Sequence, residues 1–97
     1  MNKIEEKADF EKMFSLGRGI FKSKNYSSAK TILEKCLLIP ETQNDNIKMM
    51  DVKLYLAYTN IYLLNYQLAV NNLSKALEIC ELHLNEGRNT EKFSFSK

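Results

Sequence analysis

Residues 25–39, NYSSAKTILEKCLLI, and residues 65–79, NYQLAVNNLSKALEI, are two versions of one segment, and they decide the fold. The offset between them is forty residues, and extending the alignment backwards in this register adds further agreements of residue type. The paired positions are Leu16 with Leu56, Phe21 with Ile61, Asn25 with Asn65, Tyr26 with Tyr66, Ala29 with Ala69, Leu33 with Leu73, Lys35 with Lys75, Leu37 with Leu77 and Ile39 with Ile79. So many agreements in one register indicate an internal repeat of a helix, a short turn carrying Asn-Tyr and a second helix. A hairpin of that size cannot bury its apolar face alone, so the two copies are expected to stack.

The chain outside these segments also reads as helical. Only Pro40 and the glycines Gly17, Gly19 and Gly87 interrupt it, and no strand-length window alternates apolar and polar residues. The sequence therefore predicts a single all-α domain over residues 1–97. Its four helices are expected at residues 3–22, 27–38, 47–64 and 66–85, joined at 23–26, 39–46 and Asn65, with a short tail over 87–97.

Local signals set the expected helix boundaries. Ser27 or Ser28 can cap the second helix, because a short side-chain oxygen accepts from the free N–H groups of the first turn. Pro40 ends that helix, because the residue before a proline is pushed out of the α region. The first helix is amphipathic, and its expected apolar stripe is Ile4, Ala8, Met13, Leu16, Ile20 and Phe21.

Composition limits the classes of function. The chain has 97 residues, a formal net charge of +2, 44% hydrophobic and 27% charged residues, which is the balance of a soluble globular protein. Its basic residues are spread out, which argues against nucleic acid as a partner, and no window is apolar enough for a membrane span. The charged start of the chain does not resemble a secretory signal, so we expect a cytoplasmic or nuclear protein. In that setting Cys36 and Cys80 are expected to be packed thiols.

The positions that repeat carry a family pattern. The first copy has Met13, Leu16-Gly17, Ile20, Ala29, Leu33, Cys36 and Pro40 where W-x2-L-G-x2-Y, A-x3-F and P would stand. The chain resembles the tetratricopeptide repeat family here, in a long-period form of about forty residues. In that pattern Gly17 opposite Ala29 allows close helix approach, Leu16, Ile20 and Leu33 fill the interface, and Tyr26 plugs the hairpin.

The second copy follows the pattern less closely. It has Leu56-Ala57, Tyr66, Ala69, Leu73 and Ala76, but Lys53 and Asn60 stand where aromatic residues are usual. A one-residue shift of its first helix, which would bring Leu54 and Ile61 into the consensus positions, stays open. The extra residues of the long period fall in 41–46, as a polar loop or a helix extension. The resemblance implies two antiparallel hairpins in a short right-handed α-solenoid, repeat one over about 10–40 and repeat two over about 47–86. A generic four-helix bundle is the alternative fold.

The resemblance also implies a binding surface. In this family the first helices of the hairpins line a concave groove that binds peptides or helices. The corresponding residues here are Phe14, Ser15, Arg18, Phe21, Lys22, Leu54, Tyr55, Tyr58, Ile61 and Tyr62. Either a partner segment fills this groove, with Arg18 and Lys22 orienting an acidic partner, or the chain closes it and Tyr58 and Tyr62 are core aromatics. The family's clamp for chaperone C-termini is not matched, because Phe14, Arg18 and Tyr55 occupy its positions.

We therefore expect a protein- or peptide-binding module that is not an enzyme and has no catalytic residues, metal site or cofactor. His83 has only Glu81 and Glu86 nearby in sequence and lacks a third metal ligand. The alternative is a structural, self-associating or terminal element of a larger repeat assembly, in which the fourth helix makes a homo-oligomeric contact. That helix has more apolar residues than one neighbour can cover, and Phe93 and Phe95 of the tail are candidates to fold back onto it. The apolar residues in question are Leu68, Leu73, Ala76, Leu77, Ile79, Cys80, Leu82 and Leu84.

Overall fold

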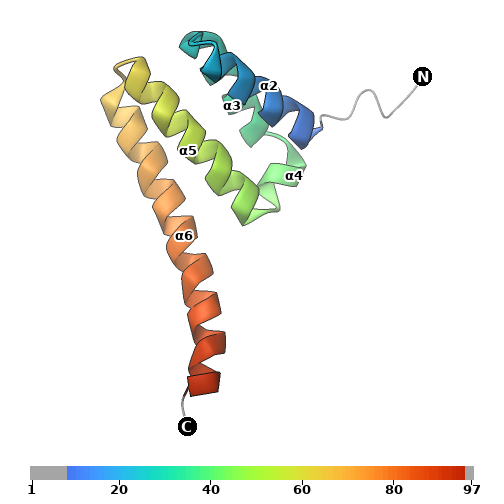
Figure 1. Ribbon diagram of the computed structural model, residues 1–97, viewed down its shortest axis with the longest axis vertical. Helices are drawn as coiled ribbons and strands as arrows, with labels where there is room; N and C mark the ends of the chain where they lie inside the picture. Colours follow the sequence, from blue (N-terminus) through green and yellow to red (C-terminus); the bar gives the residue numbers. More distant parts are fainter. Residues whose placement is uncertain (1–8, 96–97) are drawn as a thin grey trace, which may run out of the picture.

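The computed structural model describes the backbone of residues 9–95 and the side chains of residues 9–86. Within this part every regular element is a helix, and the predicted all-α class is confirmed. The helices are α2 (Phe10–Lys22), α3 (Tyr26–Leu37), α4 (Pro40–Gln43), α5 (Asn46–Tyr62) and α6 (Tyr66–Phe95). Figure 1 shows α2 and α3 as one hairpin and α5 and α6 as another, with α6 running well past the start of α5.

The helices pack mainly on their neighbours in chain order. α3 lies against both α2 and α5, and α5 lies against both α3 and α6, while α4 bridges α3 and α5. The described part measures 53 × 41 × 18 Å, and its radius of gyration is 16.1 Å. A compact chain of this length would have a radius of gyration of about 12.5 Å. The described part of the chain is therefore flat and elongated.

The two hairpin turns have the same geometry forty residues apart. Lys24 has φ = 69° and Leu64 has φ = 65°, so each turn has one residue in the left-handed region. The matching backbone bonds are Asn25 N–H to Ile20 O and Asn65 N–H to Asn60 O, then Lys24 N–H to Phe21 O and Leu64 N–H to Ile61 O. This pair of bonds around a left-handed residue is the Schellman motif. The register of the internal repeat is thus the same in the structure as in the sequence.

Helix α3 is capped by Asn25, and the prediction of Ser27 or Ser28 is wrong. Asn25 Oδ1 accepts from the backbone N–H of Ser28 at 3.4 Å, and the helix begins at Tyr26. The left-handed Lys24 turns the chain early, so the first free N–H groups of α3 point to Asn25 instead of to a serine. α5 is capped in a similar way, because Asp45 Oδ1 accepts from the N–H groups of Ile47 and Lys48.

The extra residues of the long period are neither only a loop nor only an extension of the flanking helices, because residues 41–43 belong to a separate short helix, α4, and Asn46 begins α5. Ile39 is extended, with ψ = 130°, as expected before a proline, and Pro40 is the first residue of α4. Thr42 of this helix is fully buried. Lys48 Nζ lies 3.5 Å from a carboxylate oxygen of Glu41 and 3.3 Å from one of Asp45, which ties α4 to the start of α5. The chain therefore has five described helices, one more than predicted.

Most of the core lies between α2, α3 and α5. Its buried residues are Phe10, Phe14, Ala29, Leu33, Cys36, Ile39, Val52 and Leu56. The contact between α5 and α6 buries smaller apolar side chains, Ala57, Ala69 and Ala76. Leu33 is completely buried, whereas its repeat equivalent Leu73 is 40% exposed, because α2 and α5 both pack on α3, whereas α5 is the one described helix that packs on α6.

The buried face of α2 differs from the predicted stripe. Leu16 was expected to fill the hairpin interface, but it is 52% exposed. Phe10, Phe14 and Gly17 are buried instead, and Leu16 points about 100° away from Gly17 around the helix. α2 and α3 approach closely at Gly17, but the nearest neighbours are Leu33 and Ile32 and not Ala29 as predicted, since a Cβ atom on Gly17 would lie 2.9 Å from Leu33 Cδ2.

The predicted tail is helical as far as Phe95. α6 continues through Gly87 without a break, so the boundary expected after residue 86 is wrong. A single glycine costs a helix only about 1 kcal/mol, which the neighbouring residues offset. The predicted insertion of Phe93 and Phe95, and the early stripe residues Ile4 and Ala8, lie outside the residues whose side chains are described.

Candidate functional site

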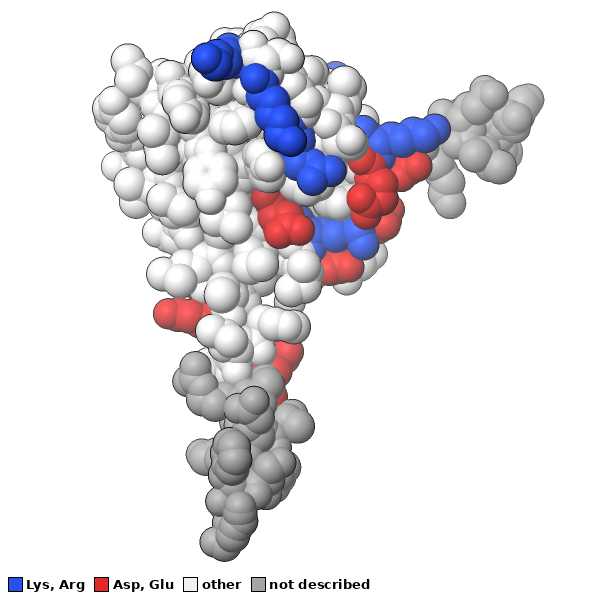
Figure 2. All heavy atoms as spheres, in the orientation of Figure 1, with Lys and Arg blue, Asp and Glu red and all other residues white. Residues whose placement is uncertain are grey.

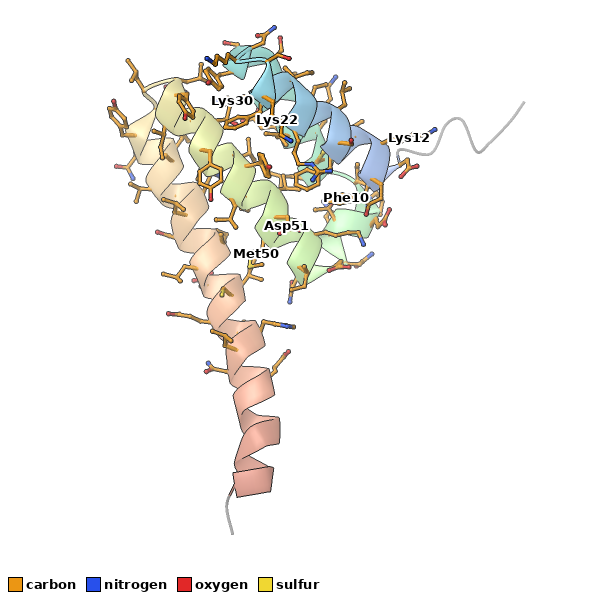
Figure 3. All side chains as sticks on the ribbon, viewed as in Figure 1. Phe10, Lys12, Lys22, Lys30, Met50 and Asp51 are labelled. Carbon is orange, nitrogen blue, oxygen red and sulfur yellow. The ribbon has the colours of Figure 1, made fainter. Side chains whose placement is uncertain are left out.

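The ten residues predicted to line the groove, Ser15 among them, lie on two helices that face the viewer in Figure 3. α2 provides Phe14, Arg18, Phe21 and Lys22, and α5 provides Leu54, Tyr55, Tyr58, Ile61 and Tyr62. The two helices also touch each other directly. Residues from both halves of the repeat therefore share one face of the molecule.

Aromatic rings connect the two helices. The Tyr55 ring meets Phe14 and Phe21 edge-on, with centroids 5.5 and 5.6 Å apart. Tyr62 packs edge-on against Phe21 at 5.8 Å and lies flat on Tyr26, with the rings 4.5 Å apart and tilted by only 4°. We define the aromatic cluster as Phe10, Phe14, Phe21, Tyr26, Tyr55, Tyr58 and Tyr62. Edge-to-face and offset contacts at these distances are favourable beyond the burial of apolar area.

The cluster passes from the core to the surface. Phe14 is 6% exposed, so it belongs to the core and cannot be a contact residue as predicted. Phe21, Tyr26 and Tyr55 are half-buried. Tyr58 is 45% exposed and Tyr62 58% exposed. The exposed rings are thus held from below by rings that are themselves packed.

Tyr58 and Tyr62 are not core aromatics in the described structure. The alternative prediction required α2 and the C-terminal segment to close over them. α6 instead packs along α5 and then projects beyond the start of α5, as Figure 1 shows. The face that carries the two rings therefore stays uncovered by the described residues.

Two basic residues of α2 border the cluster. The Arg18 guanidinium carbon lies 4.7 Å from the centre of the Phe14 ring, a cation–π contact, and Arg18 Nε has no hydrogen-bond partner among the described residues. Lys22 is exposed on the same helix. In Figure 2 the basic side chains of the drawn face gather over α2, and the acidic ones lie mostly toward α4.

The sequence did not reveal several residues that build this site. Phe10 was missed, although it precedes Phe14 by four residues and therefore lies on the same side of the helix. Tyr26 meets Phe21 of its own hairpin edge-on at 5.5 Å, as expected of a residue that plugs the hairpin, but its stacking on Tyr62 of the next hairpin was not predicted. The repeat equivalent Tyr66 is exposed and makes no such contact among the described residues.

A polar network joins α5 to α6 behind this face. Asn60, which departs from the aromatic consensus, is buried and its Nδ2 donates to Asn72 Oδ1 at 2.9 Å. Asn65 Nδ2 donates to Asn60 Oδ1 at 3.2 Å. The three asparagines satisfy one another, which explains a buried polar side chain where the family pattern has a ring.

Outside the aromatic cluster, charged side chains of the described residues form ion pairs, Lys48 with Glu41 and Asp45, and Lys75 with Glu78. Among the described residues no three His, Cys, Asp or Glu side chains come close enough to hold a metal ion. Burial raises the pKa of the Cys36 thiol to about 11, which keeps it protonated and unreactive at neutral pH. As far as the structure describes them, the helices are too short or too polar to cross a membrane.

The face therefore offers rigid aromatic rings, the half-buried guanidinium of Arg18 and the exposed ammonium of Lys22. These groups can bind an apolar or aromatic side chain together with a carboxylate. No family model, curated protein or solved structure matches the chain.

Proposed function

We propose that the chain is a protein-binding helical module, built from stacked tetratricopeptide-like hairpins, whose contact surface is the exposed edge of the aromatic cluster. The observation that carries this proposal is the exposure of Tyr58 and Tyr62 on a packed aromatic base. Tyrosine is enriched at binding hot spots because it offers a large contact area and has few rotatable bonds to restrain. Rings held by other rings lose little further freedom on binding.

The repeat geometry supports the tetratricopeptide-like part of the proposal. Both hairpins close with the same turn, and α3 packs between its own partner α2 and the first helix of the next hairpin. Sequential packing of this kind is what stacked repeats require. A right-handed solenoid of two repeats is the arrangement that the proposal adopts.

The basic border suggests the chemistry of the partner. Arg18 Nε is buried, so a carboxylate would meet the outer nitrogens of the Arg18 guanidinium, and Lys22 lies one turn further along α2. A partner segment with an aromatic or apolar side chain next to an acidic residue would place a carboxylate beside them. We propose such a segment, in a peptide or a helix, as the ligand. A cytoplasmic or nuclear location belongs to the same proposal and is supported by the free thiols of Cys36 and Cys80.

The proposal is tested by selecting peptides that bind the full chain from a display library and comparing variants. Tyr58→Ala should weaken binding of a selected peptide by about 30-fold, because a central hot spot contributes about 2 kcal/mol. Arg18→Gln should weaken peptides with an acidic residue more than their neutral versions. Leu38→Ala is the control, because Leu38 is 73% exposed and lies outside the cluster.

Circular dichroism must show unchanged helix content in each variant. Equal affinity of the wild type and Tyr58→Ala for every selected peptide would show that the aromatic cluster is not the contact surface.

A further inference from the structure

A second apolar surface runs along α6. We call it the α6 seam, and its residues are Tyr66, Val70, Leu73, Leu77, Cys80 and Leu84. Their spacing alternates between four and three residues, which is the seven-residue repeat of helices that pair side by side. Five of the six are exposed and Cys80 is half-buried. The seam extends for about 27 Å along the helix.

The first hairpin shows what covers a surface of this kind. Forty residues earlier, the positions equivalent to Tyr66, Leu73 and Leu77 are Tyr26, Leu33 and Leu37 on α3. α5 packs on that row, where Tyr62 stacks on Tyr26 and Leu33 is fully buried. The second hairpin has the same row on α6 without a described helix over it. The seam is therefore built to receive a helix.

The first helix of the second hairpin widens this surface. On α2, three aromatic residues belong to the core or pack against it beside α5, and they are Phe10, Phe14 and Phe21. The residues forty positions later, on α5, are Met50, Leu54 and Ile61. Met50 and Leu54 are half-buried and Ile61 is exposed. A helix on the α6 seam would contact this row as well, just as α5 contacts α2.

The opposite end of the molecule cannot supply that helix. One side of α5 packs on α3. The residues forty positions before that side lie on α2, and they are Lys12, Ser15, Leu16, Gly19 and Lys22. Only one of them is apolar, so α2 of another copy would place lysines over the seam. Head-to-tail stacking of copies into a filament is therefore disfavoured.

The α6 seam is complementary to itself when two copies run antiparallel. In that arrangement Tyr66 faces Leu84 of the second copy, Val70 faces Cys80, and Leu73 faces Leu77. Each of these three contacts then occurs twice about a two-fold axis. Two of them pair a larger side chain with a smaller one, and the third pairs two leucines. An isologous contact of this kind closes at the dimer. Figure 2 shows only isolated charged side chains along the described part of α6 on the face that it draws.

We propose that a second copy of this chain covers the α6 seam, with the two α6 helices antiparallel. The contact would extend over the whole seam, with Met50 and Ile61 of α5 at its margin. It would also support the part of α6 that projects beyond α5, because a single helix without tertiary contacts is marginal in water. The α6 seam shares no residue with the aromatic cluster, although the row of α5 beside it includes Leu54 and Ile61 of the predicted groove, and the two proposals are tested by different measurements.

Sedimentation of the full chain over the micromolar range tests the proposal. The wild type should be dimeric at the upper end of the range and dissociate on dilution. Leu77→Glu should make it monomeric, whereas Leu82→Glu should leave the dimer intact. These two leucines are matched, because both are on α6 and are 58% and 53% exposed, but only Leu77 belongs to the seam. A wild type that stays monomeric, or an equal effect of the two variants, would overturn the proposal.

Disulfide trapping tests the direction of the helices. In the antiparallel dimer the two Cys80 residues are about 15 Å apart along the helices, too far for the about 7 Å reach of a disulfide. Mild oxidation should therefore leave the wild type uncrosslinked and should crosslink Val70→Cys, through Cys80 of the other copy. Crosslinking of the wild type, or of Val70→Cys with Cys80→Ser, would indicate parallel helices and contradict the proposal. Neither test depends on peptide binding, and the Leu77→Glu variant should still bind the selected peptides.

Discussion

Lys24 and Leu64 hold the left-handed position of their turns, where glycine is the usual residue. A side chain with a Cβ atom costs about 1–2 kcal/mol in this conformation, and glycine avoids the cost. Leu64 is largely exposed, so removing its side chain loses little packing.

We therefore expect Leu64→Gly and Lys24→Gly each to raise the free energy of unfolding by about 1 kcal/mol. The midpoint of a urea transition measures this. Ser23→Gly is the control, because Ser23 has φ = −78° and gains nothing from glycine. A lower midpoint for Leu64→Gly would mean that its side chain contributes more than its backbone costs.

Gly17 and Gly19 lie on one helix but in opposite surroundings. A Cβ atom at Gly17 would lie 2.9 Å from Leu33 Cδ2, and Leu33 is fully buried and has little room to move. A Cβ atom at Gly19 would have no heavy atom within 4 Å outside the local backbone. Gly19→Ala should stabilise the chain by about 1 kcal/mol through helix propensity. Gly17→Ala should destabilise it by about 1–2 kcal/mol through overpacking.

Thermal melts of the two variants measure how one added methyl group changes stability at each of the two glycines. A stabilising Gly17→Ala would show that α2 and α3 can separate by a few tenths of an ångström at no cost.

At the scale of elements, the asparagine network fixes α5 against α6. Asn60 is 2% exposed, and its Nδ2 donor loses the Oδ1 acceptor when Asn72 is replaced. Asn72→Ala should therefore destabilise the chain by about 1–3 kcal/mol, the cost of an unsatisfied buried donor. Replacing both residues with leucine or alanine should cost less than the sum of the single changes, and a double-mutant cycle measures the coupling. Additive effects would mean that the bond contributes nothing.

The start of α5 responds to acid through its cap. The backbone N–H of Lys48 and then its ammonium group lower the pKa of the Asp45 carboxyl. A carboxyl whose pKa is lower in the folded chain stabilises the fold above its unfolded pKa, and this stabilisation is lost as pH falls through the folded pKa. The stability difference between the wild type and Asp45→Asn should therefore be largest at neutral pH and shrink below a pH of about 4. Urea transitions across this range measure it, and a constant difference would contradict the prediction.

Elements set by short-range chemistry could be predicted from the sequence, and those set by tertiary contacts could not. The repeat and its turns could be predicted, because Asn-Tyr recurs with flanking apolar residues. The exposure of Leu16 and the burial of Phe14 could not, because the angular position of the buried face depends on where α3 and α5 lie. α4 was missed because four residues carry no periodicity. For the site, the sequence predicted that residues of α2 and α5 lie side by side but did not predict the Tyr26–Tyr62 stack, which joins different hairpins.

At the scale of the whole molecule, one part of α6 packs on α5 and another part does not. Residues near Ala69 and Ala76 pack on α5, whereas residues 81–86 are exposed all round among the described residues. Amide hydrogens of residues 81–86 should therefore exchange faster than those of residues 69–76 in dilute solution. Hydrogen exchange followed by mass spectrometry resolves the two segments. Equal protection at high dilution would mean that another part of the chain packs on this end of α6.

The flat shape of the described part also affects how stability changes with temperature. Its thinnest dimension, 18 Å, is less than two helix diameters, so every helix borders solvent along its length. Less apolar surface is then withdrawn from water on folding than in a compact domain of equal length. The heat capacity of unfolding should fall below the usual value of about 12–15 cal/mol/K per residue. A small heat capacity change gives a broad, shallow stability curve, so the monomer's free energy of unfolding should vary little between cold and physiological temperatures.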